Sequence, residues 1–208
     1  MKRTAILLII ILSGFFAEAQ MNWVKQWDHR YGGLGGDYVM TFEKTDDGGY
    51  ILAGRSSSDS SGNKTTNIFG NGAFDYWVIK LNHLGVLQWE KNFNASDNEW
   101  LWSLNKTSDG GYIIGGWSDS PIGGDKSEAS RGGEDYWILK LDGSGNKIWD
   151  KTFGGTDDDE LNFIFETSDG GYLLGGDSRS QIGGDKTEAR FGITDYWIVK
   201  TDSAGNKL

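Results

Sequence analysis

Asp135-Tyr136-Trp137-Ile138-Leu139-Lys140-Leu141 stands in the second half of the chain, and its first three residues recur at 75–77 and at 195–197. The spacing between successive copies is sixty residues each time. A second marker, Asp-Gly-Gly-Tyr, recurs in the same order at 47–50, 109–112 and 169–172. Interleaved markers in a constant order indicate one supersecondary unit that is written about three times.

The middle unit has the pattern of four strands. Residues 101–106 alternate apolar and polar side chains, which is typical of a half-buried strand. An Asp-Gly-Gly turn leads to the apolar run 112–117, as expected for a strand that is covered on both faces. After a long polar connection, residues 136–141 and 147–153 form two more apolar segments, which a tight Gly-containing turn separates. No segment beyond the N-terminus has a sustained helical period.

Four antiparallel strands in about sixty residues, repeated, predict an all-β fold of the β-propeller type, with about three four-stranded blades. The alternative is a linear β-solenoid, which is less favoured because solenoid coils are usually shorter. The repeats are expected at about 37–93, 99–153 and 159–208. Residues 22–31 align with the fourth strand of a blade, so we expect a strand there as well.

Three blades are too few for the closed propellers that are usual, which have four to eight. Residues 205–208 match residues 145–148 and stop inside the motif that leads to the fourth strand. We therefore expect an incomplete propeller. Either the chain is a piece of a longer protein, which is the favoured interpretation, or three-blade units assemble into an oligomer.

The first nineteen residues have the pattern of a secretory signal peptide. Lys2 and Arg3 precede the apolar run 5–12, and Ala17 and Ala19 form a small-x-small cleavage site. The apolar run is shorter than the roughly 20 residues that span a bilayer, which argues against a membrane anchor. The sequence therefore predicts a mature chain of residues 20–208, exported to the outer-membrane surface or beyond.

The amino-acid composition limits the classes of partner and the ways in which the fold can be stabilised. Thirty acidic residues against 20 basic ones give a formal net charge of −10, so nucleic acid and anionic membranes are poor candidates. The chain has no Cys, so no disulfide stabilises it, and 10 Trp, 10 Phe and 8 Tyr are available for a packed core. We expect no cofactor, apart from a calcium ion considered below.

The run 135–155, with Trp149, Lys151 and the Gly154-Gly155 pair at its end, is similar to the bacterial seven-bladed β-propeller repeat family. It also resembles repeats in large secreted proteins of gliding Gram-negative bacteria, which often end in a type IX secretion sorting domain. The resemblance covers essentially all of residues 20–208. It implies the propeller fold and a secreted location, but no particular activity, because most such proteins have no assigned function.

Acidic residues recur at one position of the connection between successive units, at Asp37, Glu99 and Asp159, and Asp157 adds charge in the third. Clustered carboxylates can bind calcium, which takes six to eight oxygen ligands. The favoured alternative is a carboxylate that caps a turn by accepting backbone N–H bonds, repeated because the turn is repeated.

The long connection in the second and third units contains charged residues that we consider as binding candidates: Asp125, Lys126, Glu128 and Arg131, and Asp185, Lys186, Glu188 and Arg190. Loops on a rigid scaffold often hold binding residues. Near-identity between the two copies instead favours a structural role, such as a latch between blades. The first unit diverges in this segment.

Most of the tryptophans repeat with the strands and are expected in the core. Trp100, Trp102 and Trp117 fall outside that repetition and are candidates for contacts with a sugar ring, although burial is the favoured interpretation for these three as well. Catalysis has little support, because the two histidines lie in no recognisable motif.

The sequence therefore predicts a non-enzymatic scaffold or binding module for an extracellular glycan or an envelope protein. The alternative is a polysaccharide hydrolase or lyase whose catalytic residues lie partly outside this chain.

Overall fold

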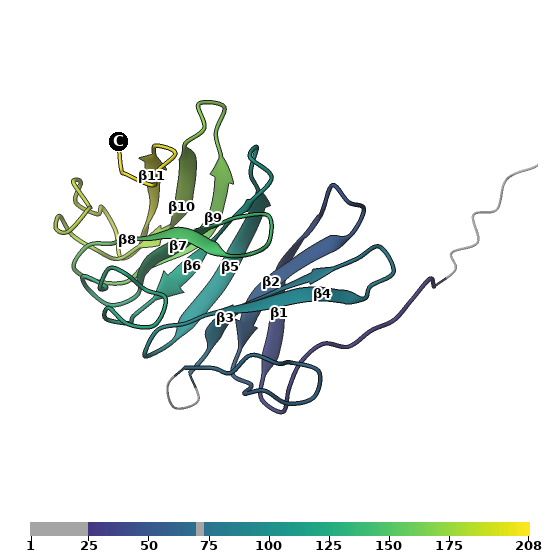
Figure 1. The fold of residues 1–208 in the computed structure, drawn as a ribbon. Coiled ribbons are helices and arrows are strands. Elements are labelled where there is room, and N and C mark those ends of the chain that lie inside the picture. Colours follow the sequence, from purple (N-terminus) through teal and green to yellow (C-terminus); the bar gives the residue numbers. More distant parts are fainter. Residues whose placement is uncertain (1–24, 70–72) are drawn as a thin grey trace, which may run out of the picture.

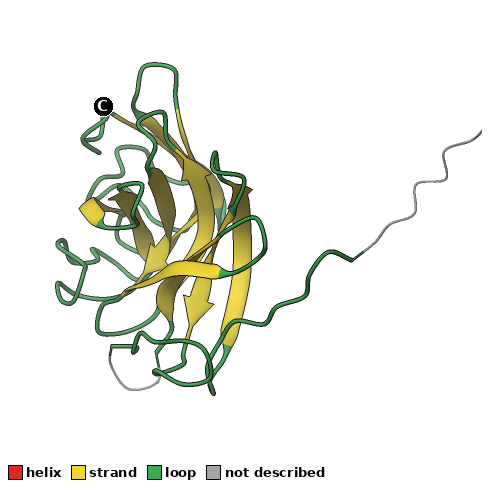
Figure 2. Cartoon of the chain, turned by 45° about the vertical axis from the view of Figure 1, so that its right-hand side comes forward, coloured by secondary structure: helices red, strands yellow, loops and turns green. Residues whose placement is uncertain are grey.

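The computed structural model describes residues 25–69 and 73–208 and contains strands, turns and loops (Figure 2). Within these residues, eleven strands form three antiparallel sheets, and no helix is long and apolar enough to cross a membrane. The all-β prediction is confirmed. The predicted signal peptide, residues 1–19, and the beginning of the strand predicted at 22–31 lie outside the described residues.

The sheets follow one another along the chain (Figure 1). The first contains β1 (Asp37–Lys44), β2 (Tyr50–Ser56), β3 (Asp75–Leu81) and β4 (Leu87–Phe93). The second contains β5 (Glu99–Lys106), β6 (Tyr112–Ser118), β7 (Asp135–Leu141) and β8 (Lys147–Phe153). The third contains β9 (Asp159–Glu166), β10 (Tyr172–Ser178) and β11 (Asp195–Thr201). We call them blades 1, 2 and 3.

The Asp-Gly-Gly-Tyr marker forms the hairpin between the first two strands of each blade. In blade 2 the Asp109 carboxylate accepts hydrogen bonds from the Thr107 hydroxyl at 2.6 Å and from the Gly111 N–H at 3.0 Å. Lys140, from β7, binds the same carboxylate at 2.9 Å. Thr107, Lys140 and Gly111 lower the pKa of Asp109 to about 2. Gly110 has a φ of +82°, a backbone conformation that is strained for any residue with a side chain. The marker therefore ties a turn to the third strand.

The Asp-Tyr-Trp marker packs one blade against the next. Tyr76 is fully buried, its ring centroid lies 4.8 Å from that of Trp137, and its hydroxyl donates to the Trp137 carbonyl at 3.0 Å. Tyr136 repeats the contact with Trp197, at 5.0 Å and 2.9 Å. Apolar side chains on both sides complete two cores, one for each pair of blades. The third strand of a blade thus supplies the ring that the next blade covers.

The first strands of successive blades converge: β5 contacts β1, and β9 contacts β5. We call β1, β5 and β9 the inner strands. This arrangement of blade-like sheets, together with the absence of ring closure among the described residues, is that of an incomplete propeller. Blade 3 shows three strands, and β11 forms its outer edge.

Each inner strand contains a β-bulge. The pairing with the second strand skips Met40 in β1, Trp102 in β5 and Asn162 in β9. A glycine of the second strand faces each bulge, and a Cβ on Gly116 would lie 1.8 Å from the Trp100 carbonyl oxygen. The preceding glycine, Gly115, faces Leu161 of the next blade at 2.5 Å from an added Cβ. The glycine pair therefore serves both the bulge and the close approach of two blades.

Residues 25–31 form no strand in the structure, although the sequence predicts one. The described residues supply no neighbouring strand on that side with which this segment could pair. It nevertheless lies against blade 1, where Trp27 covers Gly85 of the turn between β3 and β4.

Candidate functional site

The blades differ from one another most clearly at matching positions around the inner strands. The markers Asp-Tyr-Trp and Asp-Gly-Gly-Tyr are the same in all three blades, so they reflect the needs of the fold. Among the positions that differ are Tyr38, Trp100 and Glu160; the bulge residues Met40, Trp102 and Asn162; and Arg55, Trp117 and Asp177. Side chains that vary on a repeated scaffold are candidates for recognition rather than for folding.

In blades 1 and 2 these positions bring together an aromatic patch, which consists of Tyr38, Phe74, Trp100, Trp102 and Trp117 around Arg55. Arg55 pairs across the sheet with Tyr38, and Trp117 pairs with Trp100. The Arg55 guanidinium carbon lies 3.6 Å from the centroid of the Trp100 ring and 5.1 Å from that of Tyr38. Trp100 and Trp117 are stacked at 5.0 Å with an interplanar angle of 13°.

The aromatic patch is partly open to solvent. Trp117 is buried, at 8% exposure, whereas Trp100 and Trp102 are half-buried and Tyr38 is exposed. Burial lowers the pKa of Arg55. No carboxylate of the described residues forms a salt bridge with this guanidinium, which lies against the ring faces and donates to the Met40 sulfur at 3.9 Å. Of the three predicted tryptophans, Trp102 is therefore available for contact, and the other two support it.

The matching region of blades 2 and 3 is charged. Arg179 binds Asp158 at 2.7 Å and Glu160 at 3.5 Å. Burial raises the pKa of Glu134 to about 7, and the nearby carboxylates of Glu160 and Asp158 add to this shift. We call these four residues the charged patch. One region of the scaffold thus presents flat apolar rings at one blade junction and hydrogen-bonding charges at the next.

The loop residues that the sequence offered as binding candidates contact the neighbouring blade. Asp125 accepts a hydrogen bond from the Asn94 N–H at 3.1 Å, and its own N–H donates to the Asn94 carbonyl at 2.7 Å. Asp185 makes the same pair of bonds with Gly154. Asn63 makes it with Gly32, so the first unit keeps the contact although its sequence diverges. These bonds form the latch between blades that the sequence also suggested.

The other loop candidates divide into buried and exposed residues. Lys126 and Lys186 are buried, and burial lowers the pKa of Lys126 to about 8. Arg131 joins two loops through Asp185 at 3.1 Å and also lies within 3.9 Å of Glu128. Glu188 is exposed, and Arg190 donates to the Ile193 carbonyl. The structure does not bring this set together with the tryptophans into one site.

The acids considered for calcium lie one in each blade, at the start of the inner strand. The Glu99 carboxylate accepts hydrogen bonds from the hydroxyls of Ser118 at 3.0 Å and Ser120 at 2.6 Å and from the Ala95 N–H at 3.1 Å. Asp37 makes three equivalent bonds, and Asp159 makes two of them. We call each acid with its two serines an acid–serine corner. These hydrogen bonds are the ones expected if the acid caps a turn, which is the alternative to calcium binding.

Burial dominates the electrostatics of the Glu99 corner. It raises the pKa of Glu99 to about 8, and the hydrogen bonds from Ser120, Ala95 and Ser118 only partly offset that shift. Asp157 is the fourth acid considered, and its backbone N–H donates a hydrogen bond to the Ser180 hydroxyl at 2.9 Å. In the described part of the chain, no three His, Cys, Asp or Glu side chains gather closely enough to hold a metal ion.

Sequence reasoning did not find Arg55, Tyr38 or Phe74. They come from blade 1 and meet Trp100 only through the contact between two blades. A signal was nevertheless present, because aligning the three units position by position shows that the residues matching Trp100 and Trp117 are also not repeated.

No protein-family model matches the chain, and no curated protein does either. Among solved structures, the chain is similar to a protein of unknown function from Bacteroides caccae, with 14% sequence identity and a TM-score of 0.29. That match covers 82% of this chain, and the chain spans 65% of the length of the other protein.

Proposed function

We propose that the protein is a secreted, non-enzymatic binding module that holds an extracellular glycan on the surface formed by the aromatic and charged patches. The observation that carries the proposal is the divergence of the blades at Tyr38, Trp100 and Glu160 and at the bulges beside them, on a scaffold whose other markers repeat. Binding residues commonly vary on a framework that stays constant.

The two patches suit the two kinds of surface on a sugar ring. Trp102 offers a half-buried indole, against which the C–H face of a pyranose can pack, and Trp100, covered by Arg55 and Trp117, supports it from behind. Arg179, Glu160 and Asp158 offer donors and acceptors for hydroxyl groups. Arg55 stacks on Trp100 and leaves little conformational freedom to that ring, so the platform is formed before a ligand arrives.

A binding measurement tests the proposal. Oligosaccharides from extracellular and cell-wall polysaccharides are titrated into the protein, with calorimetry and tryptophan fluorescence as readouts. We expect Trp102→Ala to weaken binding roughly thirtyfold, which corresponds to the loss of about 2 kcal/mol at a central aromatic contact. The control is Phe191→Ala, because Phe191 is fully exposed and lies in the loop between β10 and β11 of blade 3, outside both patches.

Two results would contradict the proposal. One is an equal affinity of the Trp102 variant and the wild-type protein for every glycan that binds. The other is a panel in which no glycan binds while an envelope protein does, which would favour the protein-binding alternative. N-terminal sequencing of protein recovered outside the cell tests export, and the expected first residue is Gln20.

A second candidate function is a polysaccharide hydrolase or lyase, and Glu134 is the observation in its favour. A carboxyl group whose pKa is raised to about 7 can donate a proton near neutral pH, and the side chains of Glu160 and Asp158 lie nearby. A reducing-sugar release assay separates the two functions. Turnover that Glu134→Gln abolishes would establish the enzyme, whereas unchanged binding without turnover supports the binding module.

A further inference from the structure

The outer face of blade 3 exposes side chains that the other blades bury. Tyr196 is 88% exposed and Ile198 is 52% exposed. The matching residues of blade 2, Tyr136 and Ile138, are both 0% exposed, because blade 3 covers them. Apolar side chains that are exposed together on one face mark an interaction surface.

The two internal blade junctions show what covers such a face. At both junctions, a tyrosine of β3 or β7 lies over the tryptophan of the next blade, and its hydroxyl donates a hydrogen bond to the backbone carbonyl of that tryptophan. Tyr196 occupies the same position of β11, and no ring of the described residues covers it. The partner that fits this face is therefore a blade of this same repeat.

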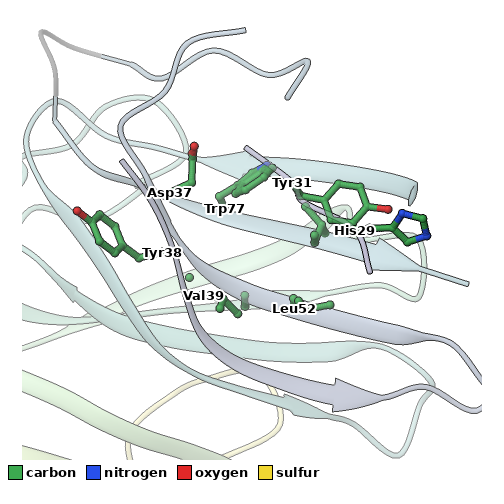
Figure 3. A pocket seen from close by; sticks show the side chains of 10 residues that line it. His29, Tyr31, Asp37, Tyr38, Val39, Leu52 and Trp77 are labelled. Carbon is green, nitrogen blue, oxygen red and sulfur yellow. The ribbon is translucent and has the colours of Figure 1, made fainter. Parts of the chain in front are cut away.

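Blade 1 has the complementary face. A pocket of about 210 Å³ opens there between the N-terminal segment and the sheet, and Val39, Leu52, Gly54, Trp77 and Ile79 are among its lining residues (Figure 3). The residues at the matching positions of blade 2 are Leu101, Ile114, Gly116, Trp137 and Leu139, and all of them are buried. Tyr76 covers that region of blade 2, next to Trp137. The pocket on blade 1 therefore has the lining that receives a tyrosine at the internal junction.

The N-terminal segment already occupies the place of a fourth strand beside this pocket. Trp27 covers Gly85 as Trp89 covers Gly145 and as Trp149 covers Gly205. Its ring meets Tyr50 edge-on at 5.9 Å, as Trp149 meets Tyr172 at 5.7 Å. The latch between Gly32 and Asn63 fixes the end of this segment. The N-terminal segment therefore takes the place of a fourth strand beside blade 1, and the first three strands of that further blade can pack next to it.

We propose that two copies of this chain associate head to tail, with the outer face of blade 3 of each copy on the free face of blade 1 of the other. Tyr196 then enters the pocket beside Trp77 of the second copy and donates to the Trp77 carbonyl. The free edge of β11 lies along residues 27–31 of that copy. The three blades that the described residues form in each copy make a ring of six in the pair, within the usual range of four to eight, whereas three copies would make nine.

The test is the oligomeric state of the full-length chain, measured by sedimentation velocity and native mass spectrometry. We expect a dimer at roughly 100 µM, which is about a hundredfold above a 1 µM dissociation constant. Tyr196→Glu and Val39→Glu each place a charge on one of the two faces and are expected to give monomers. Both side chains are exposed in the single chain, so circular dichroism is expected to stay unchanged, and the melting temperature is expected to equal that of the wild-type protein at a concentration at which both are monomeric.

Mixing the two variants tests the head-to-tail geometry. The blade 3 face of Val39→Glu and the blade 1 face of Tyr196→Glu are both intact, so an equimolar mixture is expected to recover dimers held by one junction. Ile148→Ala is the control, because Ile148 is exposed on β8, the edge strand of blade 2, and this variant is expected to remain dimeric. A wild-type monomer at every concentration, a dimer that survives Tyr196→Glu, or a mixture that stays monomeric would each overturn the proposal.

Discussion

Glu99 and Trp100 are neighbours in the chain, and they differ in almost every other respect. Glu99 is fully buried in an acid–serine corner, and the matching position of each blade is an acid. Trp100 is half-buried in the aromatic patch, and the matching residues are Tyr38 and Glu160. Because side chains alternate along a strand, consecutive residues face different surroundings. One strand can therefore maintain the fold with one face and vary its recognition with the other.

The largest effect on stability is expected from a substitution that disturbs the bulge beside Trp100, and it is the strongest test of this comparison. Gly116→Ala would place a Cβ 1.8 Å from the Trp100 carbonyl oxygen, and a backbone atom cannot yield without moving the strand. We expect the free energy of unfolding to fall by about 4 kcal/mol in chemical denaturation. Gly123→Ala is the control, because nothing lies within 4 Å of its added Cβ. Equal stability of the two variants would show that the bulge is not a structural requirement.

The acid–serine corner is expected to matter nearly as much. Glu99→Ala leaves the hydroxyls of Ser118 and Ser120 and the Ala95 N–H without an acceptor in a buried place. The expected loss of unfolding free energy is about 3 kcal/mol. Glu43→Ala, in the half-buried strand β1, controls for the loss of an acidic side chain. Similar losses from both substitutions would remove the distinction between corner and surface.

A pH series sharpens the same point. Burial raises the pKa of Glu99 from 4.5 to about 8, so between these values the folded state binds more protons than the unfolded state does. Stability is therefore expected to fall as the pH rises from 5 to 8. Glu99→Gln, which resembles the protonated acid, should reduce this fall by about 1 to 3 kcal/mol. The same series on Glu43→Gln should keep the wild-type slope, and a wild-type slope in the Glu99 variant would contradict the assignment.

The smallest effect on stability is expected at the aromatic patch. Trp102 is a bulge residue without a partner in the pairing of β5 with β6, and it is half-buried. Trp102→Ala is therefore expected to change the unfolding free energy by less than about 1 kcal/mol while it weakens glycan binding. A loss as large as that of Glu99→Ala would place Trp102 in the fold and not in the surface.

Much of the fold could be predicted because each blade repeats its signals. The strand expected at 147–153 coincides with β8, and the others differ from the structure by two residues or fewer at the ends. The bulges could not be predicted, since Trp102 between Leu101 and Ser103 only interrupts the alternation of side chains. Residues 25–31 carry the pattern of a fourth strand but have no neighbour to pair with, and pairing is a property of two segments.

The candidate site was less accessible from the sequence than the fold. Trp100, Trp102 and Trp117 were identified because they break the repeat. Arg55, which lies over Trp100, comes from another blade, and only the packing of two blades brings it there. Lys126 and Lys186 are binding candidates from the sequence because loops on a rigid scaffold often hold binding residues, whereas in the structure both side chains are buried.

The bulge also makes the scaffold a convenient one for engineering. Met40, Trp102 and Asn162 are each left out of the pairing with the second strand, so exchanging them leaves the register of the sheet intact. Each blade therefore offers one position at which a library of side chains can be displayed without redesign of the core. Moving a tryptophan from blade 2 to the same position in blade 3 would extend the aromatic platform along the molecule by one repeat.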